Sequence, residues 1–435
     1  MYKTSLILFA ISLFFSVQGK AQQKDYEYYD SLTYKLYIDK DYKQLLKAGN
    51  DALNSGFDYY YLRMRTGIAA YNLKKYRIAT THFEKASAFS DNDVIHEYLY
   101  YSSLWGGEPL KAKRVIREMS VALKDRLGIT EEGISGASVD MALLNQAEDF
   151  PADFDFPADE EGTQIVPTQF FNMSFGLSHD LSSKATMTHS FTYLHRGSDK
   201  YTLYNNQEYY DTGFNSNQYQ YYVGSAISLG HSWNLNLGGH ISAVAFPKYT
   251  DRWFQGSNQF IKTTAWNYDF IFSASVLKNF TYASFEGEMV LLSLNGNFVY
   301  QPTGTLRLYP FANLNLYTQS QFSYQIKENS NSFFHQQKVG VKVLKHLWVE
   351  ANYFSGDVSG FTLGNGALLF NGVEEVNRMV GGMVIIPTKS KFTLTLGYQN
   401  RVQSNFFYPD ADVNLKSNKL DLNYSLLFML LSWTL

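Results

Sequence analysis

Two short stretches combine the hydroxyl, imidazole and carboxylate groups that a hydrolase would use, namely Ser178-His179-Asp180 and His189-Ser190. A nucleophilic hydroxyl needs its base within hydrogen-bonding distance. Neighbouring residues of a strand point to opposite faces, so His189 and Ser190 cannot form one site by themselves. The other stretch lies in an expected turn, where such residues commonly form the turn itself. We therefore expect no catalytic residues.

The composition of the chain excludes several other kinds of functional site. The chain has no cysteine, which excludes thiol catalysis, disulfides and thiolate metal sites. Metal-ligand spacings, phosphate loops and dinucleotide motifs are also missing, so we expect no metal and no cofactor. The 37 basic and 40 acidic residues leave a net charge of −3, which gives no sign of a nucleic-acid partner.

The first 21 residues have the three parts of a secretory signal peptide. Lys3 precedes an apolar run from Leu6 to Val17, and Gly19-Lys20-Ala21 supplies small residues for cleavage after Ala21. A membrane anchor is the alternative, but this run is shorter than the ~20 residues that a spanning helix needs. We therefore expect residues 1–21 to be removed on export.

Residues 22–127 are predicted to be helical, because apolar residues recur at steps of three and four. Tyr42 and Tyr76 are 34 residues apart, and each follows a short polar turn. We expect small and aromatic residues to pack paired helices in this repeat: Tyr42, Gly67, Tyr76, Ala79, Phe83 and Ala86. The alternative is an unrelated bundle of helical hairpins.

Residues 128–435 alternate apolar and polar positions with period two, which predicts a membrane-spanning β-barrel. Such a barrel also accounts for an aromatic content of 17%. Trp266, Tyr268 and Phe270 are expected to face lipid. In the last strand, we place Leu420, Leu422, Tyr424, Leu426, Phe428 and Leu430 on the lipid face. Leu427, Met429, Leu431 and Trp433 are expected in a packed apolar lower lumen, with a passage for a hydrophobic ligand as the alternative.

Turn positions give the strand number. Short turns, including one at 302–305, and longer loops, including one at 355–375, define thirteen strands from Thr168 onward. An odd number of strands would put the two ends of the barrel on opposite sides of the membrane, which conflicts with the connection of the first strand to the preceding helices. A further strand is therefore expected at Ile134–Leu144. The fold class is therefore an all-β antiparallel transmembrane barrel of about fourteen strands, with twelve or sixteen as alternatives, after an N-terminal all-α domain.

Ten charged residues are expected to face the lumen, five acidic and five basic: Asp269, Glu286, Glu288, Arg307, Lys338, Lys342, Glu350, Arg401, Lys419 and Asp421. Mixed charge argues against a strongly ion-selective pore. Opposite charges away from bulk water need partners, so we expect pairs that hold the interior closed.

Two loops carry unusual compositions. Residues 148–161 repeat Asp-Phe-Pro-Ala-Asp, and carboxylates of this kind could bind calcium or a basic protein surface, although such loops are usually only solvated. Residues 197–215 are rich in Tyr and Asn, which could stack on sugars or face another protein.

The order of parts resembles the outer-membrane barrels with N-terminal tetratricopeptide repeats that are widespread in Gram-negative bacteria. The resemblance rests on Gly67, Ala79, Phe83 and Ala86 and on a terminal strand ending Ser-Trp-Thr-Leu, whereas typical barrels end in an aromatic residue. Exporters of cellulose and related polysaccharides join the same two parts but carry many more repeats.

The resemblance implies an outer-membrane location with the helices in the periplasm. The first hypothesis is a non-catalytic subunit of an envelope machine for outer-membrane protein assembly or secretion. Residues 25–125 would then bind a periplasmic or outer-membrane protein partner, and the barrel would be the anchor in the lipid bilayer. The second hypothesis is a transport or export channel for a small solute, lipid or polysaccharide.

Overall fold

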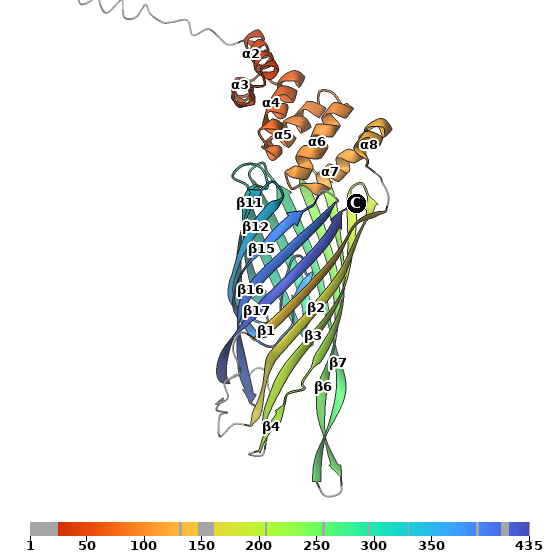
Figure 1. Ribbon diagram of the computed structural model, residues 1–435, viewed down its shortest axis with the longest axis vertical. Coiled ribbons are helices and arrows are strands. Elements are labelled where there is room, and N and C mark those ends of the chain that lie inside the picture. The colour runs from red at the N-terminus through yellow and green to blue at the C-terminus, as the bar shows by residue number, and fades with distance from the viewer. Residues whose placement is uncertain are drawn as a thin grey trace, which may run out of the picture.

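The computed structural model describes residues 25–129, 133–146, 161–204, 207–254, 257–294, 296–328, 330–388, 391–409 and 417–434. They form a helical domain that stands on one end of a tall β-barrel (Figure 1). The C-terminal strand also ends at that end of the barrel. We call it the helix end and the opposite one the loop end. The expected signal peptide, residues 1–21, lies outside the described residues.

The described part of the helical domain contains seven helices: α2 (Tyr26–Ile38), α3 (Tyr42–Asn54), α4 (Tyr60–Asn72), α5 (Tyr76–Ser87), α6 (Asp93–Trp105), α7 (Pro109–Ile116) and α8 (Val121–Leu127). Side chains of Asp25, Asp41, Asn92 and Ser120 accept hydrogen bonds from first-turn N–H groups. Such caps start helices because these N–H groups have no partner within the helix. Among the described helices, none combines the length and apolar character needed to cross a bilayer.

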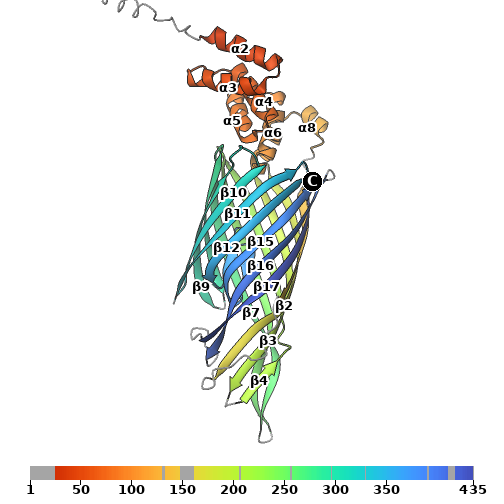
Figure 2. The same cartoon turned by 60° about the vertical axis from the view of Figure 1, so that its left-hand side comes forward.

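The helices stack away from the barrel, with α2 farthest from it (Figure 2). Helices α3 and α5 begin at Tyr42 and Tyr76, the two residues that mark the 34-residue spacing. A Cβ at Gly67 would lie 2.7 Å from the ring of Phe83, so glycine permits the close contact of α4 with α5. The other predicted packing residues also lie in this region: Ala79 and Ala86 are fully buried, Tyr42 packs on the domain core, and Tyr76 contacts Tyr71 and Trp105.

Fourteen described strands form the barrel wall: β1 (Ile134–Gln146), β2 (Gly162–Ser182), β3 (Ala185–Tyr204), β5 (Ser216–Gly230), β6 (Trp233–Phe254), β7 (Ser257–Asn279), β8 (Ala283–Leu294), β9 (Asn297–Leu308), β10 (Leu316–Ile326), β11 (Asn331–Leu344), β12 (Leu347–Val358), β15 (Glu375–Pro387), β16 (Phe392–Pro409) and β17 (Ser417–Thr434). Each pairs antiparallel with its chain neighbours, and β1 pairs with β17 from Gly136 to Gln146. The predicted closed barrel of fourteen strands is therefore confirmed.

Three short strands are not part of this closed wall. Strand β4 (Gln207–Asp211) pairs with β3 within the expected Tyr-rich loop, and β13 (Phe361–Leu363) pairs with β14 (Leu368–Phe370). Strands β6 and β7 continue pairing as far as Phe254 and Ser257 and project from the loop end (Figure 1).

The alternation predicted for β7 is confirmed. Trp266, Tyr268 and Phe270 keep 43–57% of their surface exposed on the outside. Asp269, on the opposite face, is buried in the lumen. An apolar outer surface with a polar interior is what a barrel in a bilayer requires.

The expected turn at 302–305 is wrong. Strand β9 continues through Pro302 to Leu308, and the turn at the helix end spans residues 309–315. Pro302 is tolerated in the strand because the β9–β10 pairing skips Pro302, so its missing N–H leaves no gap in that ladder. The proline had suggested a turn, yet the strand number is unchanged.

The two faces of β17 are reversed from the prediction. Leu422 and Tyr424 are buried in a lumenal cluster with Leu144 and Val166, and the other even-numbered apolar residues share that face. Leu427, Met429 and Leu431 are instead exposed on the outside, on the face predicted to line the lower lumen. The polar residues that suggested an inward face belong to the loop-end half of the strand. Near the rim of a barrel an outer face can be polar, because it lies beyond the apolar belt.

Candidate functional site

The residues considered for catalysis lie on different faces of the wall. His179 and His189 have their Nε2 atoms 3.1 Å apart, and His189 Nδ1 lies 2.7 Å from the Tyr221 hydroxyl. Ser178 instead bonds to Thr188 at 2.9 Å on the other face of the same strands, and Asp180 pairs with Lys113 of α7. Neither stretch brings a hydroxyl, an imidazole and a carboxylate together.

The lumen contains eight of the ten predicted charged residues. Arg307 pairs with Glu286 at 3.0 Å and donates to Gln319 at 2.8 Å. Lys338 lies 3.8 Å from Glu350, which also accepts a hydrogen bond of 2.6 Å from the Tyr317 hydroxyl. The expected cross-strand pairing of opposite charges is therefore present at these positions.

The other lumenal members of the predicted set have different partners. Asp269 accepts hydrogen bonds from Asn267 at 3.0 Å and from Asn371 at 3.3 Å. Glu288 shares a face of β8 with Glu286, and the Lys342 ammonium lies 4.1 Å from the Trp348 ring centroid. Arg401 lies 5.1 Å from the centre of the Phe370 ring.

Lys419 and Asp421 do not face the lumen. They form an ion pair of 3.4 Å on the outer face of β17, and each side chain is 51% exposed. Asp421 also accepts a hydrogen bond of 2.5 Å from Ser404. Their assignment to the lumen is wrong for the same reason as the assignment of the β17 faces.

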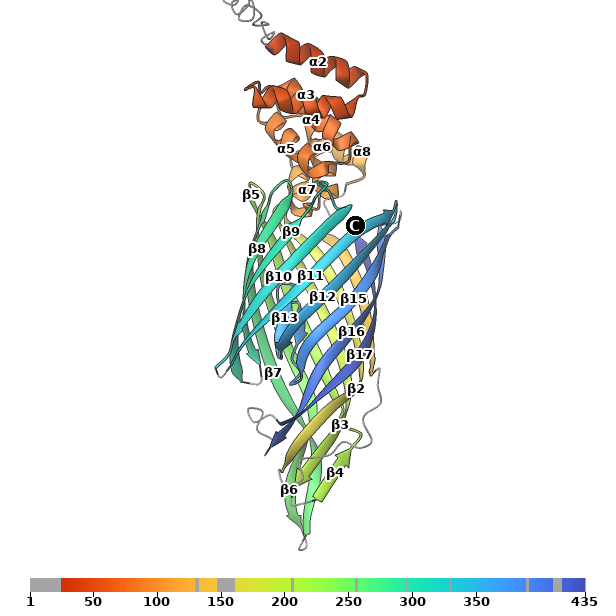
Figure 3. The same ribbon diagram turned by 90° about the vertical axis from the view of Figure 1, so that its left-hand side faces the viewer.

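The loop between β12 and β15 folds into the barrel, although the sequence predicted a long outer loop at 355–375. We call residues 359–374 the inner loop; its core is the β13–β14 hairpin, and Figure 3 shows β13 within the outline of the wall. Its tip consists of Gly364, Asn365 and Gly366, all with φ between 58° and 76°. Such left-handed positions favour glycine and asparagine, which makes this tight turn possible.

Both ends of this hairpin are tied to the wall. At the tip, the Asn365 carbonyl accepts from Ser273 at 2.7 Å, and His240 Nδ1 lies 2.9 Å from the Gly366 carbonyl oxygen. Near the start of the inner loop, Gln301 donates to the Thr362 carbonyl at 2.9 Å, and Gln325 donates to that of Gly360 at 2.8 Å.

Aromatic packing holds the same hairpin from a third side. Phe361 stacks on Phe370 with ring centres 4.4 Å apart, and it also contacts Phe334 and Phe354 of the wall. Together with the hydrogen bonds, this packing places a folded segment across the lumen.

Arg196 and Glu374 form an ion pair where the inner loop returns to β15. Neither of these residues, nor the hairpin, is among the features predicted from the sequence. Strict alternation along β3 would have placed Arg196 with the inward residues. The hairpin could also have been recognised in the sequence, because the apolar segments Phe361–Leu363 and Leu368–Phe370 flank a Gly-Asn-Gly turn. A loop in water gains nothing from such apolar segments.

A chamber of about 710 Å³ remains in the lumen beside the inner loop. Part of its lining is apolar and includes Leu144, Phe170 and Phe428. Another part carries hydroxyl and amide side chains, including Thr192 and Gln220. This volume lies within the range of small-molecule binding sites.

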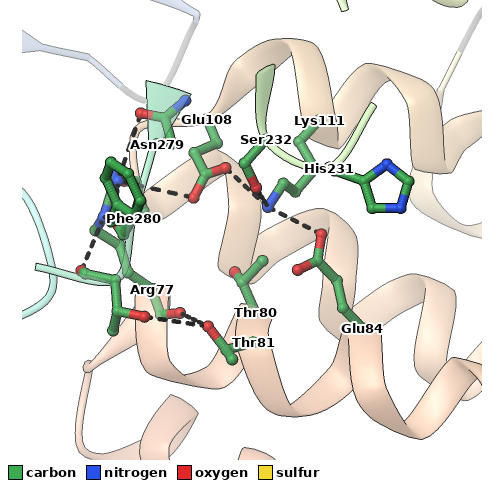
Figure 4. Close-up of polar contacts among 12 residues, drawn as sticks. Arg77, Thr80, Thr81, Glu84, Glu108, Lys111, His231, Ser232, Asn279 and Phe280 are labelled. Carbon is green, nitrogen blue, oxygen red and sulfur yellow. Dashed lines mark hydrogen bonds and ion pairs between the residues drawn. The ribbon is translucent and has the colours of Figure 1, made fainter. Parts of the chain in front are cut away.

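The helical domain is joined to the barrel through Arg77 of α5, whose side chain is fully buried (Figure 4). Its guanidinium donates to the carbonyl oxygens of Phe280 at 2.6 Å, Thr281 at 3.0 Å and Gly106 at 2.8 Å. It also lies 4.2 Å from the centre of the Tyr309 ring. Several carbonyl acceptors around one guanidinium provide the hydrogen bonds that a buried cation needs.

Helix α7 makes further contacts with the barrel rim. Lys111 donates to Ser232 at 2.8 Å and pairs with Glu108 and Glu84 at 2.8 and 2.9 Å, as Figure 4 shows. Lys113 pairs with Asp180 and donates to Thr186 at 2.8 Å.

The β9–β10 turn also contacts the helical domain. Its Asn313 donates to the Lys74 carbonyl at 2.8 Å. We call the contacts of Arg77, Lys111, Lys113 and Asn313 between the two domains the dock. The dock therefore involves four of the six turns at the helix end, those of β2–β3, β5–β6, β7–β8 and β9–β10. Contacts spread over so many turns fix the orientation of the helical domain.

Among the residues that the structure describes, no group of three or more His, Asp or Glu side chains could hold a metal ion. The acidic repeat considered for calcium falls almost wholly in residues 147–160, outside the described residues.

Comparison with known proteins yields only distant similarity. Neither protein-family models nor curated proteins give a match to this sequence. The barrel is similar to a Pseudomonas aeruginosa FadL homologue, with 8% identity, 71% of this chain and 91% of that chain covered, and a TM-score of 0.40. A mutant of the monoaromatic hydrocarbon channel TodX gives 7% identity, the same coverage and a TM-score of 0.43. Omp33 of Acinetobacter baumannii gives 7% identity, coverage of 70% and 100%, and a TM-score of 0.33.

Similarity at this level carries no inference about the role of the chain. The class of the protein follows from its own architecture. Fourteen antiparallel strands, a closed register, an apolar outer surface and a polar lumen define a β-barrel of the outer-membrane type.

Proposed function

We propose that this protein is a non-catalytic outer-membrane subunit of a multiprotein envelope machine for protein assembly or secretion. The barrel anchors a tetratricopeptide-like domain at the periplasmic face, and that domain binds a protein partner. The observation that carries the proposal is the dock: a buried arginine and contacts with four turns hold the helical domain across the barrel mouth. A channel has little use for such a rigid attachment, whereas a platform that holds a partner requires it.

The inner loop supports the same role, because a lumen crossed by a bonded hairpin does not hinder an anchor. The helices far from the barrel offer a surface suited to protein binding. Tyr34 of α2 and Tyr61 of α4 are 53% and 61% exposed, and the Arg65 guanidinium lies 5.1 and 5.6 Å from their ring centres. Exposed tyrosines around an arginine are typical of residues that dominate binding at protein interfaces.

Purification of the tagged full-length protein in a mild detergent, with identification of co-purifying proteins, tests this function. We expect a stoichiometric set of envelope proteins that decreases when Tyr34 and Tyr61 are both replaced by serine. A matched control is Tyr210→Ser, since Tyr210 is 55% exposed at the other end of the barrel. A lone monomer, or equal losses in both variants, would contradict the proposal.

A transport channel is the second candidate, and the lumenal chamber of about 710 Å³ favours it. Measurement of solute flux in proteoliposomes separates the two functions, because an anchor with an occluded lumen should show none.

A further inference from the structure

The chamber contains polar atoms that lack partners within the described chain. They are Asn172 Oδ1, Gln218 Nε2, His240 Nε2 and Arg401 Nε, and all four residues line the chamber. Gln218 and His240 are only 4% and 2% exposed. A buried polar atom without a hydrogen bond is costly, so a ligand or water must supply the missing partners.

The charged side chains of this chamber are not all paired with an opposite charge. Arg196 is paired with Glu374, and Lys338 with Glu350. Arg401 lines the same chamber, and no described carboxylate lies within ion-pairing distance of it. Two further carboxylates line the chamber. Asp269 is bonded to Asn267 and Asn371. Asp140 is far from Arg401 along the wall, because its cross-strand partner Leu430 is six residues along β17 from Tyr424, the partner of Arg401.

An apolar row lies next to these guanidinium groups. This row is formed by cross-strand neighbours on β2, β1 and β17, namely Phe170, Leu144 and Leu426. Phe428, two residues after Leu426 on the same face of β17, continues the row. Arg196 pairs with Phe170 at one end of the row, and Arg401 pairs with Tyr424, two residues from Leu426. A cation beside an apolar surface matches a ligand with a negative head and a hydrocarbon tail.

We propose that the chamber binds a small anionic amphiphile. Its head group accepts hydrogen bonds from Arg401, and its hydrocarbon part lies against Leu144, Phe170, Leu426 and Phe428. The unpartnered amide groups of Asn172 and Gln218 are then available to its polar end or to water that accompanies it. This site does not depend on the anchoring role, because a barrel can bind a ligand in its lumen whether or not the helical domain binds a partner.

Binding of radiolabelled decanoate to the full-length protein tests this site, in amphipol to avoid competition from detergent. We expect saturable binding that weakens at least about tenfold in Arg401→Gln and much less in Arg401→Lys, because the head group forms a charge-assisted hydrogen bond. The matched control is Arg307→Gln: Arg307 also faces the lumen but is paired with Glu286 and does not line the chamber, so affinity should not change.

Neutral 1-decanol separates the contribution of the head from that of the tail. Its binding should be insensitive to Arg401→Gln, whereas Leu426→Gln should weaken both decanoate and decanol. Leu426→Gln also provides a second test if Arg401→Gln does not fold, as judged by heat-dependent gel migration. Absence of saturable decanoate binding would mean that the chamber holds water only. Equal losses in Arg401→Gln and Arg307→Gln would mean non-specific charge attraction, and either result would overturn the proposal.

Discussion

Arg77 is the residue on which the connection between the two domains depends. Its guanidinium has carbonyl partners on the barrel turn and on its own domain, and its side chain has no exposure to water. Replacing it therefore affects two domains at once, because the carbonyl groups left behind would be buried without donors.

We expect Arg77→Gln to lower the free energy of unfolding of the helical domain by roughly 3 kcal/mol, the usual consequence of removing one partner from a buried charged network. The helical circular-dichroism signal of the full-length protein in denaturant measures this change. The control is Arg117→Gln, because Arg117 is an exposed arginine at the end of α7. If both variants unfold at the same denaturant concentration, the dock does not stabilise the domain.

His82 makes the helical domain sensitive to acid. Burial lowers the pKa of His82 to about 4, and the nearby Arg63 adds to this effect. The folded ring thus stays neutral to about pH 4, whereas the unfolded chain takes up a proton below the ordinary value of 6.5. Because the unfolded state binds more protons between these values, acidification through this range lowers the free energy of unfolding.

The expected loss is up to about 3 kcal/mol between pH 6.5 and 4, and His82→Gln should remove that part of the pH dependence. Denaturant unfolding at several pH values, followed by the helical signal, gives both slopes. His346→Gln is the control, since His346 is exposed in the β11–β12 turn. The assignment to His82 fails if the slope persists in His82→Gln.

At the scale of elements, the inner loop decides whether the lumen is open. Its hairpin is bonded at the tip to β6 and β7 and near its start to β9 and β10, and Glu374 at the end of the loop pairs with Arg196 of β3. A segment held at several points closes a barrel more firmly than a loop attached only at its ends, because no single contact releases it.

Replacing residues 361–370 by a short Gly-Ser linker should therefore convert a silent barrel into a conducting one. Single-channel recording in planar bilayers measures the change. Shortening β4, residues 207–211, is the control, because this strand pairs with β3 outside the closed wall and should leave conductance unchanged. Steady conductance of the unmodified protein would show that the hairpin is not the closing element.

At the scale of the whole molecule, the dock predicts that barrel and helices move as one body. The hydroxyl oxygens of Thr81 on α5 and Thr281 in the β7–β8 turn are 3.4 Å apart, and the natural chain has no cysteine. Thr81→Cys combined with Thr281→Cys should therefore form a disulfide under mild oxidation, because the sulfur atoms would be close enough to bond.

A gel shift of the oxidised protein detects that disulfide. Thr81→Cys combined with Thr186→Cys is the matched control, since Thr186 contacts Lys113 elsewhere on the rim and should not cross-link. Equal cross-linking of both pairs would indicate a mobile helical domain.

The amino-acid sequence by itself determined the barrel, its strand number and most of its lumen. Period-two alternation is local and strong, so Asp269, Glu286 and Arg307 could be placed inward from their immediate neighbours. The same rule misassigned Lys419 and Asp421, because polarity near a rim does not distinguish the lumen from the water outside.

Only the tertiary structure decided what fills and covers the barrel. The inner loop depends on contacts of Phe361, Asn365 and Thr362 with distant strands, and Arg77 meets carbonyl groups about 200 residues away. No local period records such contacts, because their free energy exists only when the closed wall has brought its partners together.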